Sequence, residues 1–475
     1  MILKKKTKIV ATIGPATESE EMLSKLLKAG LNVMRMNFSH GDFAEHQGKV
    51  DNLKKAIAKT GIPAATLQDL GGPKIRTGEF ATETGKVVIK KGQTFTLTTR
   101  TIKGDQNICS INYAKLPEEV KAGDRIMLDD GKKQLQVTAV KDQDIICKVI
   151  VGGELKGRRG VNLPDTEISM SSLTPKDKKD LEFGIKNKVD FIALSFVRRP
   201  SDITELRKIL EKNKCEAGII AKIETPQAVK NIDEIIELSD GIMVARGDLA
   251  IEVPAEEVPL IQKMIIHKCN LAAKPVITAT QMLESMIHSP VPTRAEVSDV
   301  ANAILDGTDA IMLSEETTLG SYPLEAVELM SRVSMRTEND LLHEQLLFSK
   351  ERINPKSVTE NMTAYAIRTA HKIDAKFVIA LTNAGASARM MSRYRPQLPI
   401  LVFTPNEKTY QKTLLSFGCW VFKIKSYTDF EHAVKDIKET IVKNKLAKKA
   451  DKIVIVSGRP FAKPIGTNMM IVETI

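Results

Sequence analysis

Short apolar runs alternate with amphipathic helical patterns over most of the first two-thirds of the chain, and this alternation predicts a parallel α/β structure. The runs have the length and the β-branched composition of buried strands. Helical patterns lie between them, for example over 200–212 and 258–271. Strands that alternate with helices in this number are typical of a closed (β/α)8 barrel, with a doubly wound open sheet as the alternative. The eight expected strands are 8–13, 32–36, 64–68, 191–195, 218–223, 241–245, 275–279 and 310–313.

The stretch 71–162 interrupts this alternation. It has little helical periodicity and several alternating runs, at 86–89, 94–98, 134–140 and 145–151. Asp130-Gly131 is a hairpin signal, because a type I′ turn needs positive φ at both central positions. We therefore expect a β-barrel lid domain, inserted between the third and fourth barrel strands and placed over the catalytic face, where it would exclude water.

A third unit follows the polar sequence 348–361. Its expected strands are 376–381, 398–403, 419–423, 452–456 and 469–474, with helices among the first four. This predicts a C-terminal α/β domain with a regulatory or assembly role. The expected boundaries are 1–70 with 163–347 for the catalytic barrel, 71–162 for the lid and 348–475 for the C-terminal domain.

Composition narrows the class of protein. The net charge is +11, but the lysines are dispersed and aromatics make up only 4% of residues, which argues against a nucleic-acid partner. Five scattered cysteines without a CxxC motif favour a reducing compartment. The sequence contains no run of about 18 apolar residues, so it does not predict a membrane-spanning helix. We expect a cytoplasmic protein of two to three domains.

Two carboxylates stand at the ends of neighbouring expected strands, Glu224 after 218–223 and Asp248 after 241–245. Strand ends of a parallel barrel converge on one face, where active sites are built. Mg²⁺ usually takes one or two carboxylates and completes its shell with water and substrate oxygens. With the ammonium of Lys222 beside them, the pair predicts metal-assisted chemistry on an anion.

Three more strand ends carry polar motifs: Arg-Met-Asn-Phe-Ser-His-Gly at 35–41, Gln-Asp-Leu-Gly-Gly-Pro-Lys-Ile-Arg at 68–76 and Thr-Ala-Thr-Gln-Met-Leu-Glu-Ser-Met at 278–286. In this order, together with the segments around Lys222 and Asp248, they closely resemble the pyruvate kinase family. The resemblance covers essentially the whole chain. It implies phosphoryl transfer from phosphoenolpyruvate to ADP, giving pyruvate and ATP in the last step of glycolysis, and a homotetramer.

The resemblance also implies roles for the charged residues. Glu224 and Asp248 would hold Mg²⁺, with Mn²⁺ as a substitute, and Lys222 would neutralise charge on the transferring phosphoryl group. Arg35 would contact the same phosphate. The alternative for Lys222 is a salt bridge to Glu224 inside the barrel.

Another set of residues would bind the rest of the substrate. By resemblance, Thr280 and backbone N–H groups of Arg246, Gly247 and Asp248 hold the carboxylate, and Thr280 lies near the proton path to the enolate. Taken alone, Thr280 is also a candidate helix N-cap. Thr293 and Glu296 match a capping box, which is structural.

Nucleotide and monovalent-cation contacts are expected on the other side of the site. The resemblance places Asn37, His40, Arg76 and Arg159 towards the nucleotide, with a packing role as the alternative for His40. Potassium-dependent relatives carry threonine and glutamate where this chain has Leu70 and Lys74. Since a tethered ammonium supplies the charge of K⁺, we expect no K⁺ requirement. The pocket residues are Asn37, Ser39, Asp69, Leu70 and Lys74; Arg35 pairing with Asp69 is a structural alternative, as is a solvated Lys74.

The junction 381–387 in the C-terminal domain joins an expected strand to an expected helix. The matching loop of the family holds a phosphorylated effector, so Thr382, Asn383 and Ser387 are expected to bind a sugar phosphate or AMP. Arg459 is a candidate cation for that site. Two alternatives stay open for the whole protein: a metal-dependent lyase of the pyruvate-enolate type, and an anion- or RNA-binding protein.

Overall fold

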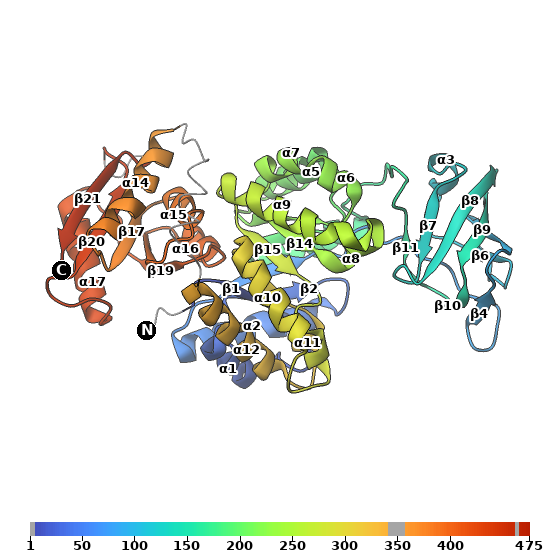
Figure 1. The fold of residues 1–475 in the computed structure, drawn as a ribbon, viewed down its shortest axis with the longest axis horizontal. Coiled ribbons are helices and arrows are strands. Elements are labelled where there is room, and N and C mark those ends of the chain that lie inside the picture. The colour runs from blue at the N-terminus through green and yellow to red at the C-terminus, as the bar shows by residue number, and fades with distance from the viewer. Residues whose placement is uncertain (1–4, 341–356, 461–464) are drawn as a thin grey trace.

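The computed structural model describes residues 5–340, 357–460 and 465–475. Three units lie in a row along the long axis of the molecule, with the C-terminal domain at one end, the barrel in the middle and the insert at the other end (Figure 1). The expected boundary at 347/348 and most of the 348–361 segment lie outside the described residues.

The central unit is a closed barrel with the strand order β1-β16-β15-β14-β13-β12-β3-β2. Every residue of these strands, apart from Thr66 and Asn37, is buried, which explains their continuous apolar runs. All eight predicted strands are present and paired in parallel, so the barrel prediction is confirmed and the open sheet is excluded. The strands are β1 (Lys8–Thr12), β2 (Val33–Asn37), β3 (Ala65–Asp69), β12 (Phe191–Leu194), β13 (Gly218–Ile223), β14 (Gly241–Ala245), β15 (Val276–Ala279) and β16 (Ala310–Leu313).

Helices surround this barrel and bury their apolar faces against it. Local signals set their ends: Ser19 caps α1 through the N–H of Met22, and the predicted capping box of Thr293 and Glu296 opens α10. The helices are α1 (Glu20–Ala29), α2 (Phe43–Thr60), α4 (Pro175–Asn187), α5 (Pro200–Lys212), α6 (Pro226–Lys230), α7 (Ile232–Leu238), α8 (Arg246–Glu252), α9 (Val258–Leu271), α10 (Arg294–Asp306), α11 (Glu315–Thr318) and α12 (Pro323–Asp340), with 3-10 turns η1 (Ala255–Glu257) and η2 (Glu284–Ile287).

The insert leaves the barrel after β3 and returns before α4. It forms a six-stranded sheet, β11-β7-β8-β9-β5-β6, and a two-stranded sheet, β10-β4. The hairpin predicted at Asp130-Gly131 joins β7 to β8, with φ of 54° and 81° at these two residues. The insert consists of β4 (Lys86–Ile89), β5 (Thr94–Thr98), β6 (Ile108–Ser110), α3 (Leu116–Glu119), β7 (Arg125–Leu128), β8 (Lys133–Lys141), β9 (Asp144–Val151), β10 (Gly153–Lys156) and β11 (Val161–Asn162).

The C-terminal domain is a five-stranded sheet in the order β19-β18-β17-β20-β21, with only β21 antiparallel to its neighbour. All five predicted strands are present. They are β17 (Phe377–Leu381), β18 (Ile400–Thr404), β19 (Cys419–Lys423), β20 (Lys452–Ser457) and β21 (Met469–Thr474), with α14 (Val358–Lys372), α15 (Ala386–Ser392), α16 (Glu407–Thr413) and α17 (Phe430–Lys443).

A buried ion pair joins the C-terminal domain to the barrel. Arg395 Nη2 lies 2.7 Å from Asp309 Oδ2, and both side chains are almost completely buried. Asp309 directly precedes β16, and Lys8, which begins β1, donates to the carbonyl of Cys419 on β19 at 2.6 Å. The C-terminal domain therefore packs on the amino end of the barrel, opposite the end that carries the insert.

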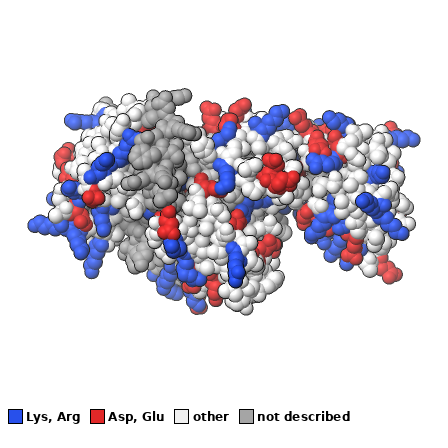
Figure 2. Space-filling view, viewed as in Figure 1, with Lys and Arg blue, Asp and Glu red and all other residues white. Residues whose placement is uncertain are grey.

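Charges of both signs are interspersed over all three units on the face shown in Figure 2. Among the residues that the structure describes, no helix combines the length and the apolar character that crossing a bilayer requires.

Candidate active site

Charged side chains gather at the carboxyl ends of four barrel strands, β2, β3, β13 and β14. Arg35 lies on β2, Asp69 ends β3, Lys222 lies on β13, and Glu224 and Asp248 follow β13 and β14. Because the strand order is β14-β13-β12-β3-β2-β1, residues that are far apart in the sequence meet on one arc of the barrel mouth.

Lys222 is the centre of this cluster. Its ammonium lies 2.9 Å from Glu224 Oε1 and 3.3 Å from Asp69 Oδ1, and it donates to Ser195 Oγ at 2.7 Å. The lysine side chain is 11% exposed, and both carboxylates are 1% exposed. The salt bridge to Glu224, which the sequence offered as the alternative to a catalytic role, is thus present.

Arg35 occupies the far side of Asp69. Its Nε lies 2.7 Å from Asp69 Oδ2 and its Nη1 donates to Thr12 Oγ1 at 2.7 Å. The pairing of Arg35 with Asp69 is therefore confirmed. Two cations share one carboxylate, which leaves the arc between Arg35 and Lys222 suited to attract an anion.

Electrostatics follow from burial and from these partners. Burial raises the pKa of Asp69, but Lys222 and Arg35 outweigh it, so the pKa stays below its usual value. Burial lowers the pKa of Lys222, but Asp69 and Glu224 outweigh it, so the pKa is raised and the ammonium stays charged. Both Lys222 and Asp69 are therefore ionised at neutral pH.

Glu224 and Asp248 are the expected metal ligands. Glu224 Oε2 accepts the N–H of Phe196 at 2.7 Å, which fixes the orientation of the carboxylate. Burial raises the pKa of Glu224, Lys222 opposes this, and the nearby charge of Asp248 raises the pKa further. Two carboxylates close enough to repel each other, one of them buried, form a donor set that fits a divalent cation with oxygen ligands.

Thr280 and Gly247 contact each other beside this pair. The N–H of Gly247 donates to Thr280 Oγ1 at 2.8 Å, and the hydroxyl donates to Ala279 O. Thr280 and Gln281 have φ of 70° and 54°. Thr280 is not an N-cap, because the helical turn that follows it, η2, begins at Glu284 with Leu283 in the cap position.

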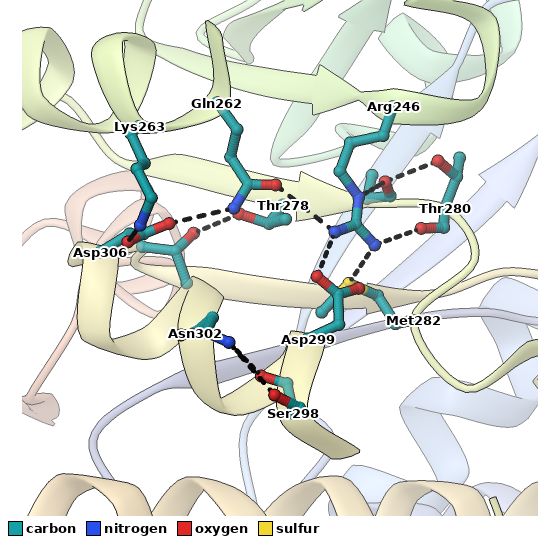
Figure 3. Close-up of polar contacts among 12 residues, drawn as sticks. Arg246, Gln262, Lys263, Thr278, Thr280, Met282, Ser298, Asp299, Asn302 and Asp306 are labelled. Carbon is teal, nitrogen blue, oxygen red and sulfur yellow. Dashed lines mark hydrogen bonds and ion pairs between the residues drawn. The ribbon is translucent and has the colours of Figure 1, made fainter. Parts of the chain in front are cut away.

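The guanidinium of Arg246 points towards Asp299, Gln262 and the segment of Thr280 and Met282, as Figure 3 shows. Its Nη1 lies 2.7 Å from Asp299 Oδ1 on α10, and its Nη2 donates to Thr280 O at 2.8 Å. Sequence reasoning missed Asp299, because a single aspartate on an amphipathic helix matches the pattern of a solvent-exposed position.

Asn37, Ser39 and His40 lie on the loop that follows β2. Asn37 Oδ1 accepts the N–H of Ser39 at 3.1 Å, and the His40 side chain is exposed. Below this loop, His46 is buried, stacks on Phe38 at 4.0 Å between ring centroids, and contacts the carbonyl of His40 through Nε2 at 3.0 Å. Sequence reasoning missed His46, which supports the loop.

Leu70 and Lys74 follow β3. The side chain of Leu70 is buried, and its carbonyl accepts Ser195 Oγ at 2.7 Å. The side chain of Lys74 is exposed and lines a cavity of about 80 Å³ between the insert and the barrel, together with Asp248 and Asp130. Leu70 and Lys74, the two positions on which the expected K⁺ independence rests, thus lie in different surroundings.

Arg76 and Arg159 belong to the insert. Arg76 is exposed and forms a bridge to Gly160 in the returning chain. Arg159 is partly exposed, and its Nε lies 3.3 Å from Asp129 Oδ1. Neither arginine has a contact with the Lys222 cluster among the described residues.

Asn162 ends the insert and contacts the barrel. Its amide donates to Glu252 Oε1 at 2.8 Å. Burial raises the pKa of Glu252 to about 7. Glu252 lies on α8, the helix that also carries Asp248, so this contact ties the returning strand of the insert to the helix of the expected metal ligand.

The junction 381–387 lines a second cavity, of about 550 Å³, in the C-terminal domain. Thr382 Oγ1 accepts the N–H of Gly385 at 3.0 Å, and Ser387 Oγ contacts Thr467 Oγ1. Lys425, Ser426 and Thr428 line the same cavity and were missed by sequence reasoning. Arg459 is exposed and is not among the described residues that line it, whereas its neighbour Gly458 is.

Comparisons with known proteins identify relatives over the whole chain. A family model described as "Pyruvate kinase, barrel domain" matches residues 4–327, and one described as "Pyruvate kinase, alpha/beta domain" matches 360–473. A pyruvate kinase of Geobacillus stearothermophilus is 44% identical over 100% of this chain and 81% of its own length, and one of Clostridium perfringens is 43% identical over 99% and 100%. The solved structure of a pyruvate kinase from Cryptosporidium parvum superposes with a TM-score of 0.95 at 36% identity, covering 99% of this chain and 96% of that one.

Proposed function

The chain belongs to the pyruvate kinase family, whose members transfer the phosphoryl group of phosphoenolpyruvate to ADP, and on that premise we propose how its residues do so. The observation that carries the proposal is the buried cluster in which Lys222 contacts Glu224 and Asp69. The lyase and nucleic-acid alternatives from the sequence are set aside, since the full-length relatives are pyruvate kinases.

Glu224 and Asp248 hold Mg²⁺, or Mn²⁺ in its place. When bound, the ion supplies Lewis-acid charge and orients the oxygens of the substrate. The N–H of Phe196 and the ammonium of Lys222 keep the Glu224 carboxylate in place. The repulsion between the two carboxylates, which raises the pKa of Glu224, is relieved by the cation.

Lys222 and Arg35 neutralise the transferring phosphoryl group. Phosphoryl transfer asks the protein mainly for positioning and charge stabilisation. Both cations are held by Asp69 at a fixed spacing, so they need little reorganisation as charge develops. Thr280, with the backbone of Arg246, Gly247 and Asp248, holds the carboxylate. To do so, the Gly247 N–H and the Thr280 hydroxyl exchange the hydrogen bonds that they make to Thr280 Oγ1 and Ala279 O for bonds to the substrate. Thr280 also lies near the proton path to the enolate.

The nucleotide binds on the side of Asn37, His40, Arg76 and Arg159. The exposed side chains of His40 and Arg76 meet phosphates when the insert closes over the barrel. Arg159, which pairs with Asp129, does so by exchanging that partner for a phosphate. ADP and ATP are the nucleotides, and the insert acts as the lid that excludes water.

K⁺ is not required. Asp69, Asn37, Ser39 and Leu70 form the monovalent-cation pocket of the family, and Asp69 is already paired with two cations of the protein itself. The exposed ammonium of Lys74 lines the cavity beside Asp248 and supplies the remaining charge.

The C-terminal cavity binds a phosphorylated activator, a sugar phosphate or AMP. Thr382, Asn383 and Ser387 offer hydroxyl and amide groups, and Lys425 adds the cation that the loop itself lacks. The enzyme works as a homotetramer in the cytoplasm, as the family assignment suggests.

Metal titration tests this assignment. Pyruvate formation from phosphoenolpyruvate and ADP is measured against Mg²⁺ and Mn²⁺ concentration in the wild type, E224Q and D248N. The proposal expects both variants to need far more metal and to lose at least 100-fold in kcat. Wild-type turnover without a divalent cation, or E224Q with wild-type metal dependence, would contradict it.

A further inference from the structure

The guanidinium of Arg246 holds one short segment of the chain. Besides Thr280 O, Nη2 contacts Met282 Sδ at 2.9 Å, and Nε donates to Ala279 O at 3.3 Å. Three of its contacts thus fall on 279–282, the turn that follows β15 (Figure 3). The side chain is 13% exposed, so these contacts are shielded from water.

The backbone of this turn has an unfavourable conformation that needs contacts from outside the turn to persist. Thr280 and Gln281 both have positive φ, at 70° and 54°. Residues with a Cβ rarely adopt such angles, and for a β-branched residue they are an outlier. A conformation of this kind persists only where the surroundings impose it. Arg246 stabilises this conformation by donating hydrogen bonds to the carbonyls of Ala279 and Thr280.

Asp299 in turn orients Arg246. Its Oδ1 lies 2.7 Å from Arg246 Nη1, and Gln262 Oε1 contacts the same nitrogen at 3.4 Å. Asp299 lies on α10 and Gln262 on α9, so two barrel helices fix the guanidinium from the side opposite the turn. The aspartate contributes the charged partner, which makes the stronger hydrogen bond.

We propose that Arg246 and Asp299 are positioning residues: Asp299 orients the guanidinium, and the guanidinium holds the turn so that the Thr280 hydroxyl and the Gly247 N–H stay together. Their 2.8 Å contact brings together the two groups that the proposed function assigns to the substrate carboxylate. The link to the substrate carboxylate rests on the proposed function of Thr280.

A matched pair of variants tests this. D299N removes the charge that orients Arg246. D306N is the control, because Asp306 lies on the same helix and pairs with Lys263 rather than with Arg246. Asp306 also accepts a hydrogen bond from Gln262, which the oxygen of an asparagine can still accept, so D306N should leave Gln262 and Arg246 in place. D299N should raise KM for phosphoenolpyruvate and lower kcat about ten-fold or more each, since small misplacements of reacting groups cost up to about 100-fold. KM for ADP should stay within about two-fold, as should all constants of D306N.

The two KM values, for phosphoenolpyruvate and for ADP, do not depend on how much of the enzyme is active. They therefore separate a misplaced Thr280 turn from a simple loss of folded protein. D299N constants equal to those of D306N would overturn the proposal. R246K gives a second comparison, since a lysine ammonium is a point charge that cannot bind several acceptors in a plane. If Asp299 acts through Arg246, D299N adds less than about two-fold in the R246K background. Independent, multiplying effects would overturn the proposal.

A crystal structure of D299N tests the turn without reference to activity. The proposal expects Thr280 to leave positive φ and the Gly247–Thr280 hydrogen bond to lengthen. A Thr280 that keeps both would overturn it. A wild-type protein that makes no pyruvate would refute the proposed function instead, and the φ angle of Thr280 in D299N would still decide whether Asp299 holds the turn.

Discussion

Lys222 and Glu224 form an ion pair of 2.9 Å inside the barrel mouth, where their side chains are 11% and 1% exposed. A buried pair of this kind is weak support for stability, because desolvation offsets its Coulomb energy. Its position at the strand ends indicates that it is kept for chemistry. Asp69 and Ser195 hold the same ammonium, so its position is over-determined before any substrate binds.

Replacing Lys222 should affect both stability and catalysis. K222M leaves Glu224 and Asp69 buried without their shared cation, so we expect a loss of about 3–5 kcal/mol in unfolding free energy. The transition-state charge also loses a partner, which costs roughly 10²–10³ in kcat. Urea unfolding and initial-rate kinetics measure the two effects.

K268M is the control for this variant. Lys268 pairs with Asp233 at the surface, with side chains 32% and 76% exposed. An exposed pair is worth about 1 kcal/mol or less, so K268M should be near wild type in both measurements. A K222M enzyme with unchanged kcat would contradict the role given to Lys222.

Lys74 should decide the response to K⁺. K74E replaces the ammonium beside Asp248 with a carboxylate, so the variant should need added K⁺ for full activity, while the wild type does not. Initial rates with K⁺ or with an equal concentration of tetramethylammonium measure this. K74Q separates loss of the cation from gain of a negative charge. Indifference of K74E to K⁺ would count against a charge-supplying Lys74.

Lys425 should decide effector affinity. It lines the C-terminal cavity together with the 382–387 loop. K425A is expected to weaken binding of a sugar phosphate or AMP about ten-fold, the size of one charged contact. K452A is the control, because Lys452 is exposed at the opposite end of β20. Isothermal titration with each compound gives the affinities, and equal values for both variants would rule out a phosphate at Lys425.

Lys8 and Trp420 offer a pH-dependent signal at the junction of the barrel and the C-terminal domain. The ammonium lies 5.2 Å from the centre of the indole ring, and burial lowers the pKa of Lys8 to about 8. Glu338, Asp309 and Lys5 are the other charged groups around it. Since Trp420 is the only tryptophan in the chain, its emission should titrate with a midpoint near pH 8, and K8M should abolish this step.

The lowered pKa of Lys8 also determines how the free energy of unfolding changes with pH. Between pH 8 and the usual lysine value of 10.5, Lys8 is neutral in the folded state and charged in the unfolded state. The unfolded state then binds more protons, so this residue makes the unfolding free energy rise with pH across that window. Comparing wild type with K8M isolates the contribution, and an equal pH slope in both proteins would contradict the assigned pKa.

Sequence reasoning found the barrel because its strands are buried on both faces and therefore appear as continuous apolar runs. It found Glu224, Asp248 and Lys222 because charged residues at strand ends interrupt those runs. It offered the pairs Arg35–Asp69 and Lys222–Glu224 as alternatives, but it did not foresee that Asp69 also contacts Lys222. That contact depends on the neighbour order β2-β3-β12-β13, which no local pattern specifies.

Other residues of the two sites could not be identified from any local sequence pattern. Ser195 contacts the Lys222 ammonium, but a serine after a strand resembles any turn residue. Lys425 and Ser387 line one cavity although 37 positions separate them, so only the folded chain brings them together. Asp299 was hidden for the same reason, because its partner Arg246 lies on a different helix.

Pyruvate formation from phosphoenolpyruvate and ADP with Mg²⁺, first in buffer free of K⁺ and then with K⁺ added, tests the proposed function most directly. We predict full activity without K⁺ and little change when it is added. Activity that requires K⁺ would contradict the role of Lys74 while keeping the phosphotransfer. No pyruvate in either buffer, with sugar phosphates or AMP present, would contradict the assignment of the Lys222 cluster as the active site.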